Sequence, residues 1–394
     1  MLYAIVPHAS KSPPHLHWHE NDGPHQARWI SEAKHPPPKH LTLADDTLPA
    51  DQAYRLASAG HGLLWRGDFQ NARHLLQALM RRIDKPKKSA KKVAPAATPL
   101  EQFHRHRMAQ AQRAHILNAI LIPVQADHRI DLRRAPEVAQ ACAEVLGEQT
   151  EPYVLSLRQL QALIAAHEWR KKGVLIPALN AHIHPHYGVF SPIRGEYLEL
   201  LMQAELPPNC TTAWDIGTGT GVIAAILAKR GIPNITATDT DERALHCARE
   251  NIERLGYTRQ IQIQQANLFP DAPDTPNARA DLIVCNPPWL PAKASSPVEH
   301  AVFDAGGAML KGFLSGVAQH LSEHGQAWLI MSDLAEHLGL RQLDEIPQLI
   351  TQHGLILVQR LDIRPKHGKA FDASDPLHAA RSKEITSLWC LGKI

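Results

Sequence analysis

From about residue 185 to the C-terminus, short runs of β-forming residues alternate with apolar stripes at helical spacing. Such alternation is typical of a parallel sheet covered by helices. Two stripes, over 244–255 and 310–321, predict helices. The expected strands are Thr211–Asp215, Ile235–Asp239, Ile261–Gln265, Asp281–Cys285, Ala327–Met331, Leu355–Leu361 and Thr386–Leu391. We therefore predict an α/β fold whose domain 181–394 holds a doubly wound sheet of these strands.

The first half of the chain has a weaker pattern. Residues 1–46 are rich in His and Pro and place few apolar residues in any period, so we expect them to be poorly ordered. Apolar residues at near-helical spacing predict helix over 50–82, and a mainly helical pattern resumes over 100–180. Lys, Ala and Pro give 82–99 the composition of a linker. The sequence thus predicts a mainly helical, basic region over 47–180.

Composition excludes several classes of protein. No apolar run approaches the roughly 20 residues needed to cross a bilayer, so we expect no membrane span. The five cysteines form no CxxC motif, which argues against a disulfide framework or a cysteine-rich zinc site and favours a cytoplasmic location. The run His17–Glu20 holds two histidines and an acid, but four ligands of fixed geometry are not visible, so we predict no metal site.

Charge is distributed unevenly. Residues 1–180 hold 24 Lys and Arg against 16 Asp and Glu, whereas 181–394 hold 18 against 23. A basic half joined to an acidic half is compatible with a polyanionic partner such as RNA. A solvated basic linker explains the same asymmetry equally well.

A glycine loop follows the first predicted strand of 181–394. It reads Asp215-Ile216-Gly217-Thr218-Gly219-Thr220-Gly221 and opens a helix. A dinucleotide loop, G-x-G-x-x-G/A, would need a small residue where Val222 stands. Asp215 would repel a pyrophosphate, but it could bind the ammonium group of an amino-acid ligand. Asp239, which ends the next strand, suits two ribose hydroxyls, so the pair predicts a nucleoside-type cofactor.

The turn Asn286-Pro287-Pro288-Trp289 follows a buried strand. Prolines offer no N–H but keep their carbonyls, and the Asn286 side chain adds another acceptor. Two acceptors beside the flat face of Trp289 suit a planar NH2 group, such as a base amine or a glutamine amide. The alternative is a rigid structural turn beside a core tryptophan.

Four segments carry the pattern of a known family: DIGTGTGVIAAILA from 215, ATDTDERALHCARENIERLG from 237, ANLFPD from 266 and DLIVCNPPWLP from 281. In these segments the chain resembles class I S-adenosylmethionine-dependent methyltransferases of the small-domain group. That group includes HemK-like glutamine methyltransferases and rRNA guanine-N2 methyltransferases. The resemblance implies a Rossmann-like methyltransferase sheet and S-adenosylmethionine as the cofactor.

The resemblance also implies roles for individual residues. Asp215, Gly217, Gly219 and Gly221 would line the methionine part of the cofactor, Asp239 would hold the ribose, and Asn267 and Leu268 would contact the adenine. Asn286, Pro287 and Trp289 would orient the acceptor, with Asn286 also lining the cofactor site. Asn267 replaces the family's usual Asp, and Trp289 replaces the commoner tyrosine.

These observations predict an S-adenosylmethionine-dependent N-methyltransferase that acts through its NPPW motif, with an rRNA base amine as the expected acceptor. Alternatives are a protein glutamine N5-methyltransferase of the release-factor type and a nucleic-acid-binding protein with an inactive methyltransferase domain. A nicotinamide-dependent oxidoreductase is disfavoured by Val222 and the NPPW turn. A basic connection over 364–381 should lie at the cofactor edge, facing substrate or forming a plain surface loop. The sequence leaves the oligomeric state open.

Overall fold

The computed structural model describes residues 13–85, 96, 98–192, 195–270, 279–294, 297–366 and 368–394. The chain divides into two compact units: the N-terminal unit comprises 1–91 and 109–165, and the C-terminal unit comprises 92–108 and 166–394. Helices α3 (Pro99–Leu117) and α5 (Leu157–Lys172) each contribute residues to both. The predicted boundary at 181 therefore falls inside the C-terminal unit, because α5 runs across the division.

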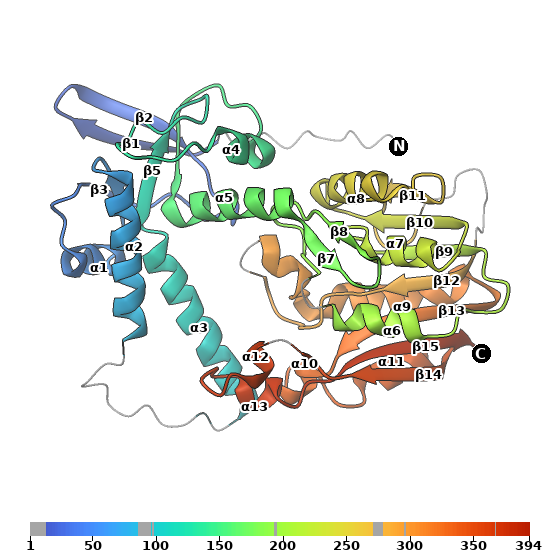
Figure 1. Cartoon of the computed structure of the whole chain (residues 1–394). Coiled ribbons are helices and arrows are strands. Elements are labelled where there is room, and N and C mark those ends of the chain that lie inside the picture. Colours follow the sequence, from blue (N-terminus) through green and yellow to red (C-terminus); the bar gives the residue numbers. More distant parts are fainter. Residues whose placement is uncertain are drawn as a thin grey trace, which may run out of the picture. The chain divides into compact units, whose positions relative to one another are not determined.

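The C-terminal unit is built on a seven-stranded sheet in the order β11-β10-β9-β12-β13-β15-β14 (Figure 1). Strand β15 is antiparallel to both of its neighbours, and the other neighbouring pairs are parallel. The strands are β9 (Thr212–Ile216), β10 (Asn234–Asp239), β11 (Ile261–Gln265), β12 (Ala280–Cys285), β13 (Leu321–Ser332), β14 (Leu355–Ile363) and β15 (Thr386–Lys393). Each predicted strand is present, so the predicted doubly wound α/β sheet is confirmed.

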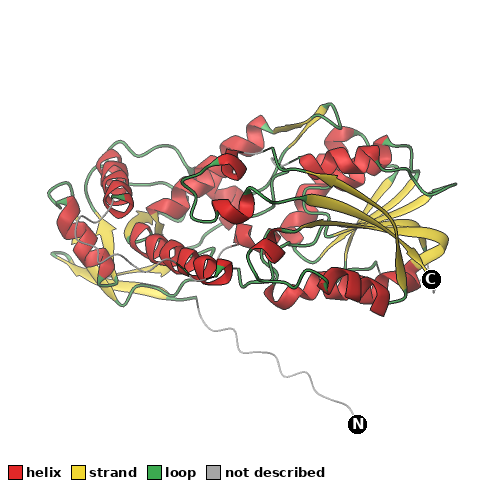
Figure 2. Cartoon of the chain, turned by 90° about the horizontal axis from the view of Figure 1, so that it is seen from below, coloured by secondary structure: helices red, strands yellow, loops and turns green. Residues whose placement is uncertain are grey.

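Helices cover both faces of this sheet (Figure 2). On one face lie α6 (Glu196–Gln203), α7 (Val222–Lys229) and α8 (Glu242–Leu255); on the other lie α9 (Ala308–His320) and α11 (Glu345–Gln352). The strands are apolar on both sides because each side meets helices. In β12, Leu282 and Val284 join the core under α6 and α7, whereas Ile283 and Cys285 join the core under α9. Alternation of this kind is the two-residue period of a strand.

The chain reverses direction across the sheet between β9 and β12. After β9 it winds outward through β10 and β11, and it then returns to β12 on the other side of β9. Ligands bind at such a reversal, beyond the carboxyl ends of the strands. The remaining elements of the C-terminal unit are β7 (Val174–Ile176), β8 (Ala181–Ile183), the 3-10 turns η1 (Pro297–Ala301) and η2 (Ala305–Gly307), α10 (Leu334–His337), α12 (Gly368–Phe371) and α13 (His378–Arg381).

The N-terminal unit contains a six-stranded sheet in the order β1-β2-β6-β5-β4-β3. Strands β3, β4 and β5 are parallel to one another, and β6 is antiparallel to β5. Its elements are β1 (His15–Glu20), β2 (Gly23–Trp29), β3 (His40–Ala44), α1 (Ala50–Ser58), β4 (His61–Trp65), α2 (Phe69–Asp84), β5 (Ile120–Val124), α4 (Ala139–Leu146) and β6 (Tyr153–Ser156).

The expectation that 1–46 is poorly ordered is wrong for the described part of that segment, which carries β1, β2 and β3. In β1, Leu16 is buried, whereas His17 and His19 are exposed. The histidines therefore occupy the outward-facing positions of a half-buried strand. Because the segment contains so many histidines, its two-residue alternation was not recognised in the sequence. Glu20, the acid of the run His17–Glu20 that was weighed as a metal site, forms an ion pair with Arg66. Residues 1–12 lie outside the described residues.

Helices α1 to α5 make up most of the described part of 47–180, as predicted, but the prediction missed β4, β5 and β6, which supply the middle of the N-terminal sheet. Leu63 and Leu64, read as part of one long helix, lie fully buried in β4. A short, continuous apolar run fits a buried strand and a buried helix equally well, and periodicity alone does not separate them. Most of the predicted linker 82–99 lies outside the described residues; its ends belong to α2 and α3.

Candidate functional site

Three of the predicted site residues lie in one row across the carboxyl edge of the sheet. In the register, Ile216 of β9 pairs with Thr238 of β10 and with Cys285 of β12. The next residues along these strands are Gly217, Asp239 and Asn286. Because neighbouring strands lie ~4.8 Å apart, the backbones of Asp239 and Asn286 are about 10 Å from each other. The glycine loop begins between them.

The glycine loop needs glycine at three positions. Gly217, Gly219 and Gly221 have φ angles of 74°, 55° and 80°, a region that side chains disfavour. The amides of Gly217 and Thr218 both donate to the carbonyl of Thr238, at 2.9 and 2.8 Å, which ties the loop to β10. A Cβ on Gly219 would meet no atom within 4 Å, so the main chain there is open to a ligand.

Asp215 is a fully buried carboxylate with one oxygen unsatisfied. Its Oδ2 accepts hydrogen bonds from Thr218 Oγ1 at 2.7 Å and from the Ala224 amide at 3.1 Å. Its Oδ1 is buried and has no hydrogen-bond partner among the described residues. Burial raises the pKa of this carboxyl to about 6. A buried unpaired acceptor costs free energy, and a cationic ligand group would remove that cost.

Asp239 is held so that both of its oxygens face donors. The Gly219 amide donates to Oδ2 at 3.1 Å, and the Asp241 amide donates to Oδ1 at 3.0 Å. Burial raises the pKa of its carboxyl. Each carboxylate oxygen accepts more than one hydrogen bond, so both keep capacity for a hydroxyl group. The site therefore fits a ribose diol.

After β11, the apolar side chain of Leu268 lies next to the exposed, polar Asn267. Leu268 has a φ of 67°, and its carbonyl accepts from Thr238 Oγ1 at 2.6 Å. Its side chain packs against α9, where a Cβ on Gly312 would come within 2.8 Å of Leu268 Cδ1. Asn267 is exposed beside it. The sequence reasoning missed Gly312 and Gly316, whose four-residue spacing in an apolar helix was the available signal.

The turn Asn286–Trp289, called the acceptor turn for its expected role with the methyl acceptor, is fixed by an internal hydrogen bond. Trp289 Nε1 donates to Asn286 Oδ1 at 3.0 Å, and both side chains are half-buried. This bond fixes the plane of the Asn286 amide and uses one of the two lone pairs on its oxygen. The other lone pair remains available to a substrate. The indole N–H of Trp289 therefore fixes the Asn286 amide, a role that the sequence reasoning did not foresee.

A buried arginine also holds this turn. Arg341 Nη2 donates to the Trp289 carbonyl at 2.9 Å, and Arg341 Nη1 pairs with Glu336 at 3.3 Å. The two side chains are only 2% and 7% exposed. A guanidinium with several donors in a rigid plane positions two acceptors at once. No sequence motif indicated Arg341, because its contact joins positions far apart in the chain.

Contacts through Leu290, Asp304 and Met309 link the turn Asn286–Trp289 to the glycine loop. The Asp304 amide donates to the Leu290 carbonyl at 2.9 Å, and Asp304 Oδ2 accepts from the Met309 amide at 2.7 Å. The Met309 side chain lies against Gly217, where an added Cβ would come within 2.5 Å of Met309 Cε. Arg107 of α3 forms an ion pair with Glu299 at 3.1 Å. This part of the C-terminal unit was not predicted to contribute.

The predicted basic connection after β14 has the expected topology, since β14 ends at the carboxyl edge and β15 returns antiparallel. Two of its cations are paired within the unit: Lys366 with Glu199 at 2.9 Å and Arg381 with Asp375 at 3.0 Å. Two apolar residues of this connection, Leu377 and Ala380, belong to the same hydrophobic cluster as Leu290. A substrate-facing role for this connection stays a prediction.

We expect Arg341→Gln to lower the free energy of unfolding by about 3–5 kcal/mol, because it leaves Glu336 buried without its cation. Urea unfolding followed by circular dichroism measures this loss. The control is Arg360→Gln, which breaks an exposed pair with Asp362 and should cost less than about 1 kcal/mol. Equal losses in the two variants would show that the Arg341 pair has no special structural weight.

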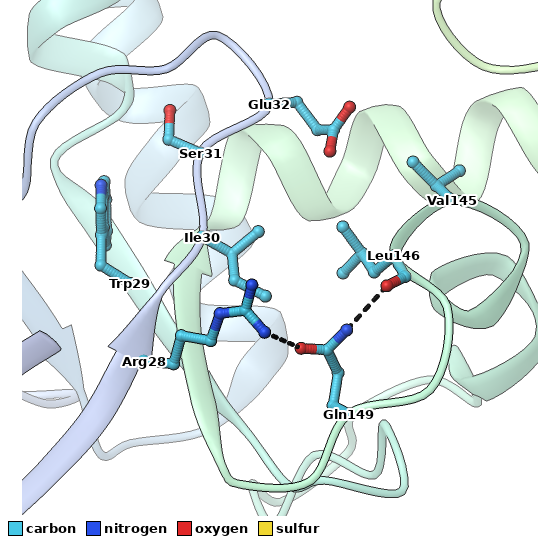
Figure 3. Close-up of a pocket in the computed structure, with 8 residues that line it drawn as sticks. All are labelled: Arg28, Trp29, Ile30, Ser31, Glu32, Val145, Leu146 and Gln149. Carbon is cyan, nitrogen blue, oxygen red and sulfur yellow. Dashed lines mark hydrogen bonds between the residues drawn. The ribbon is translucent and has the colours of Figure 1, made fainter. Parts of the chain in front are cut away.

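The N-terminal unit contains a separate pocket of about 270 Å³ (Figure 3). Arg28 Nη1 donates to Gln149 Oε1 at 3.1 Å across it, and Gln149 Nε2 donates to the Leu146 carbonyl at 2.7 Å. Its lining residues are Arg28, Trp29, Ile30, Ser31, Glu32, Val145, Leu146 and Gln149.

Over the described ranges, no helix is both long and apolar enough to cross a membrane.

A family model matches part of the C-terminal unit, and several known proteins are similar to part of the chain. Residues 180–343 match the model of the family described as "Methyltransferase small domain". A tRNA1(Val) (adenine(37)-N6)-methyltransferase of Bacteroides thetaiotaomicron is 31% identical over 160 residues, covering 39% of this chain and 62% of the relative. A release factor glutamine methyltransferase of Cereibacter sphaeroides is 30% identical over 171 residues, covering 38% and 60%. This chain thus spans less than two thirds of the length of these curated relatives.

Among solved structures, a methyltransferase from Pyrococcus furiosus aligns with 59% of this chain and 98% of its own, at 19% identity and a TM-score of 0.38.

Proposed function

We propose that this protein transfers a methyl group from S-adenosylmethionine to a planar NH2 nitrogen, and the match of residues 180–343 to the methyltransferase small domain model supports this. One observation carries most of the proposal: Asp239, the glycine loop and Asn286 lie in one row across three adjacent strands. This row supports a cofactor site directly beside an acceptor site.

The residues around the glycine loop fit the proposed cofactor. The unpaired Oδ1 of Asp215 suits the ammonium group of the methionine part, and Gly217, Gly219 and Gly221 let it approach the main chain. Asp239 suits the ribose hydroxyls, and Leu268, beside the exposed Asn267, offers an apolar surface to the adenine. When bound, S-adenosylmethionine supplies an electrophilic methyl group on a sulfonium.

The acceptor turn aligns the nucleophile. The remaining lone pair of Asn286 Oδ1 and the carbonyl of Pro287 accept the two N–H protons of a planar amine, which directs the nitrogen lone pair toward the methyl group. The face of Trp289 stacks on the conjugated plane that carries the amine. Alignment and electrostatics supply the rate, since the donor is already cationic and no strong base is needed before the attack.

We propose an RNA base amine as the acceptor and a cytoplasmic location. The basic charge of residues 1–180 supports RNA, because phosphate contacts require only clustered Lys and Arg. The two curated relatives are named for a tRNA adenine and for a release-factor glutamine, which present the same planar NH2 chemistry. A glutamine amide is therefore the second candidate acceptor.

Incubation with radiolabelled S-adenosylmethionine separates these acceptors. The purified protein is mixed in parallel with whole-cell RNA and with protein extract from which RNA has been removed. We expect label in RNA. Label confined to protein would overturn the RNA assignment while keeping the methyltransferase, and label in neither, together with binding of NADH, would overturn the proposed activity.

We expect Trp289→Phe to lower kcat about tenfold with little change in the KM for S-adenosylmethionine. Phenylalanine keeps an aromatic face but removes the indole N–H that fixes the Asn286 amide, at a cost of about 1 kcal/mol. Steady-state kinetics on the RNA fraction measures both constants. Trp169→Phe, which changes an exposed tryptophan of α5, is the control. A change in KM alone would mean that the hydrogen bond does not orient the acceptor.

A further inference from the structure

Two exposed arginines of the N-terminal unit are anchored to a single buried carboxylate. Asp68 precedes α2, and its side chain is 0% exposed. Arg133 Nε and Arg134 Nε donate to the same oxygen, Asp68 Oδ2, at 2.9 and 2.7 Å. Asp68 Oδ1 is used by the Gln70 amide at the start of α2. The anchor therefore joins a buried carboxylate to two exposed guanidinium groups.

The backbone holds the same two arginines in place. The Phe69 amide donates to the Arg133 carbonyl at 2.9 Å, and Gln70 Nε2 donates to the Arg134 carbonyl at 3.2 Å. Arg134 has a φ of 56°, a conformation that costs free energy for a residue with a side chain. The surrounding hydrogen bonds hold Arg134 in this strained conformation. Backbone strain of this kind is found more often at binding sites than in plain loops.

The binding ends of both arginines are left free. Arg133 and Arg134 are 78% and 56% exposed, and among the described residues their side chains form hydrogen bonds through Nε alone. The terminal Nη groups of each guanidinium thus project to solvent. Because Nε is already fixed, an incoming acceptor orders these groups at a smaller entropic cost than it would for a mobile arginine.

Three arginines and two carboxylates meet around this anchor: Arg73, Arg133 and Arg134, with Asp68 and Asp46. Asp46 is exposed nearby, but its Oδ1 already accepts from the Asp68 amide. Arg73, one turn along α2, donates to Gln70 Oε1. The pocket of Figure 3 is less suited to a polyanion, because Glu32 shares it with Arg28.

We propose that Arg133 and Arg134 form a phosphate clamp that binds the RNA backbone, an inference that rests on the proposed RNA substrate. Guanidinium groups match phosphate oxygens in geometry and keep their charge at every physiological pH. Two adjacent, pre-ordered guanidiniums contact two successive phosphates or one phosphate from two sides. The clamp adds affinity without sequence preference, as phosphate contacts do.

The test is the salt dependence of RNA binding by the full chain. Fluorescence anisotropy gives the Kd for fluorescein-labelled bulk tRNA between about 50 and 200 mM KCl. For Arg133→Gln/Arg134→Gln we expect about tenfold weaker binding, and a slope of log Kd against log salt that is lower by about 1.5, since each phosphate contact contributes ~0.7–0.9. The control, Arg249→Gln/Arg254→Gln, removes two exposed arginines of α8 and should leave both values unchanged.

Removing both arginines leaves Asp68 buried and unpaired, so a second variant adds Asp68→Asn and restores folding without restoring the clamp. An unchanged slope in both variants, or an equal change in the α8 control, overturns the clamp. Methyl transfer by the wild-type protein is measured on whole-cell RNA. Labelled RNA with an unchanged slope refutes the clamp alone, whereas a lowered slope without any labelled RNA supports the clamp and refutes the proposed RNA acceptor.

Discussion

Asn286→Ala is expected to lower methyl transfer to RNA about 1000-fold while leaving the affinity for S-adenosylmethionine within about threefold. The alanine removes the side-chain acceptor for the substrate amine and frees Trp289, whose indole N–H loses its partner. Both groups act on the acceptor nitrogen, so the loss should fall on kcat. Single-turnover transfer of labelled methyl measures the rate, and calorimetry measures the cofactor affinity.

The control for this variant is Asn234→Ala, which changes an exposed asparagine at the start of β10. It should transfer methyl groups at the wild-type rate. Full activity of Asn286→Ala would remove the acceptor turn from the mechanism and would favour a nucleic-acid-binding protein whose methyltransferase fold is inactive.

Asp215→Asn should have opposite effects on binding and on stability. Losing the carboxylate removes the partner of the cofactor ammonium, so we expect S-adenosylmethionine to bind about 100-fold more weakly. In the free protein the buried charge is a cost of about 3 kcal/mol above pH 6, because burial raises the pKa of this carboxyl to about 6. The variant should therefore unfold at higher urea concentration at pH 8, with a free energy of unfolding raised by about 2 kcal/mol.

The pH dependence has a definite sign. Between about pH 4 and pH 6 the folded state binds more protons than the unfolded state, so the Asp215 contribution lowers stability as pH rises through this interval. Asp215→Asn should abolish that slope, whereas Asp344→Asn, an exposed residue before α11, should keep it. Cofactor affinity of the wild-type protein should weaken as pH falls below 6. A destabilised Asp215→Asn at pH 8 with normal affinity would contradict this role for the residue.

The sheet of the C-terminal unit was predictable because both faces of its strands are buried. Runs such as Asp281–Cys285 are apolar almost throughout, and turn residues separate them from amphipathic helices. The row of Gly217, Asp239 and Asn286 followed from the same pattern, because parallel strands bring their carboxyl ends to one edge. Local sequence was therefore enough to locate the glycine loop and the Asn286–Trp289 turn at this edge.

The N-terminal sheet was not predictable in the same way. Strand β1 hides its alternation behind histidines, and β4 is a short apolar run that reads as helix. The contacts that fix the site, such as Arg341 with Trp289, join residues that local patterns do not connect. The Asp68 anchor likewise unites the start of α2 with a loop far along the chain. Such contacts depend on tertiary packing and leave no periodic trace.

A crystal structure of the protein with bound S-adenosylmethionine tests the central claim most directly. We expect the ammonium group beside Asp215, the ribose beside Asp239 and the methyl group directed at the space between Asn286 and Trp289. A methyl group that points away from Asn286, or a cofactor bound elsewhere than at the glycine loop, would contradict the account.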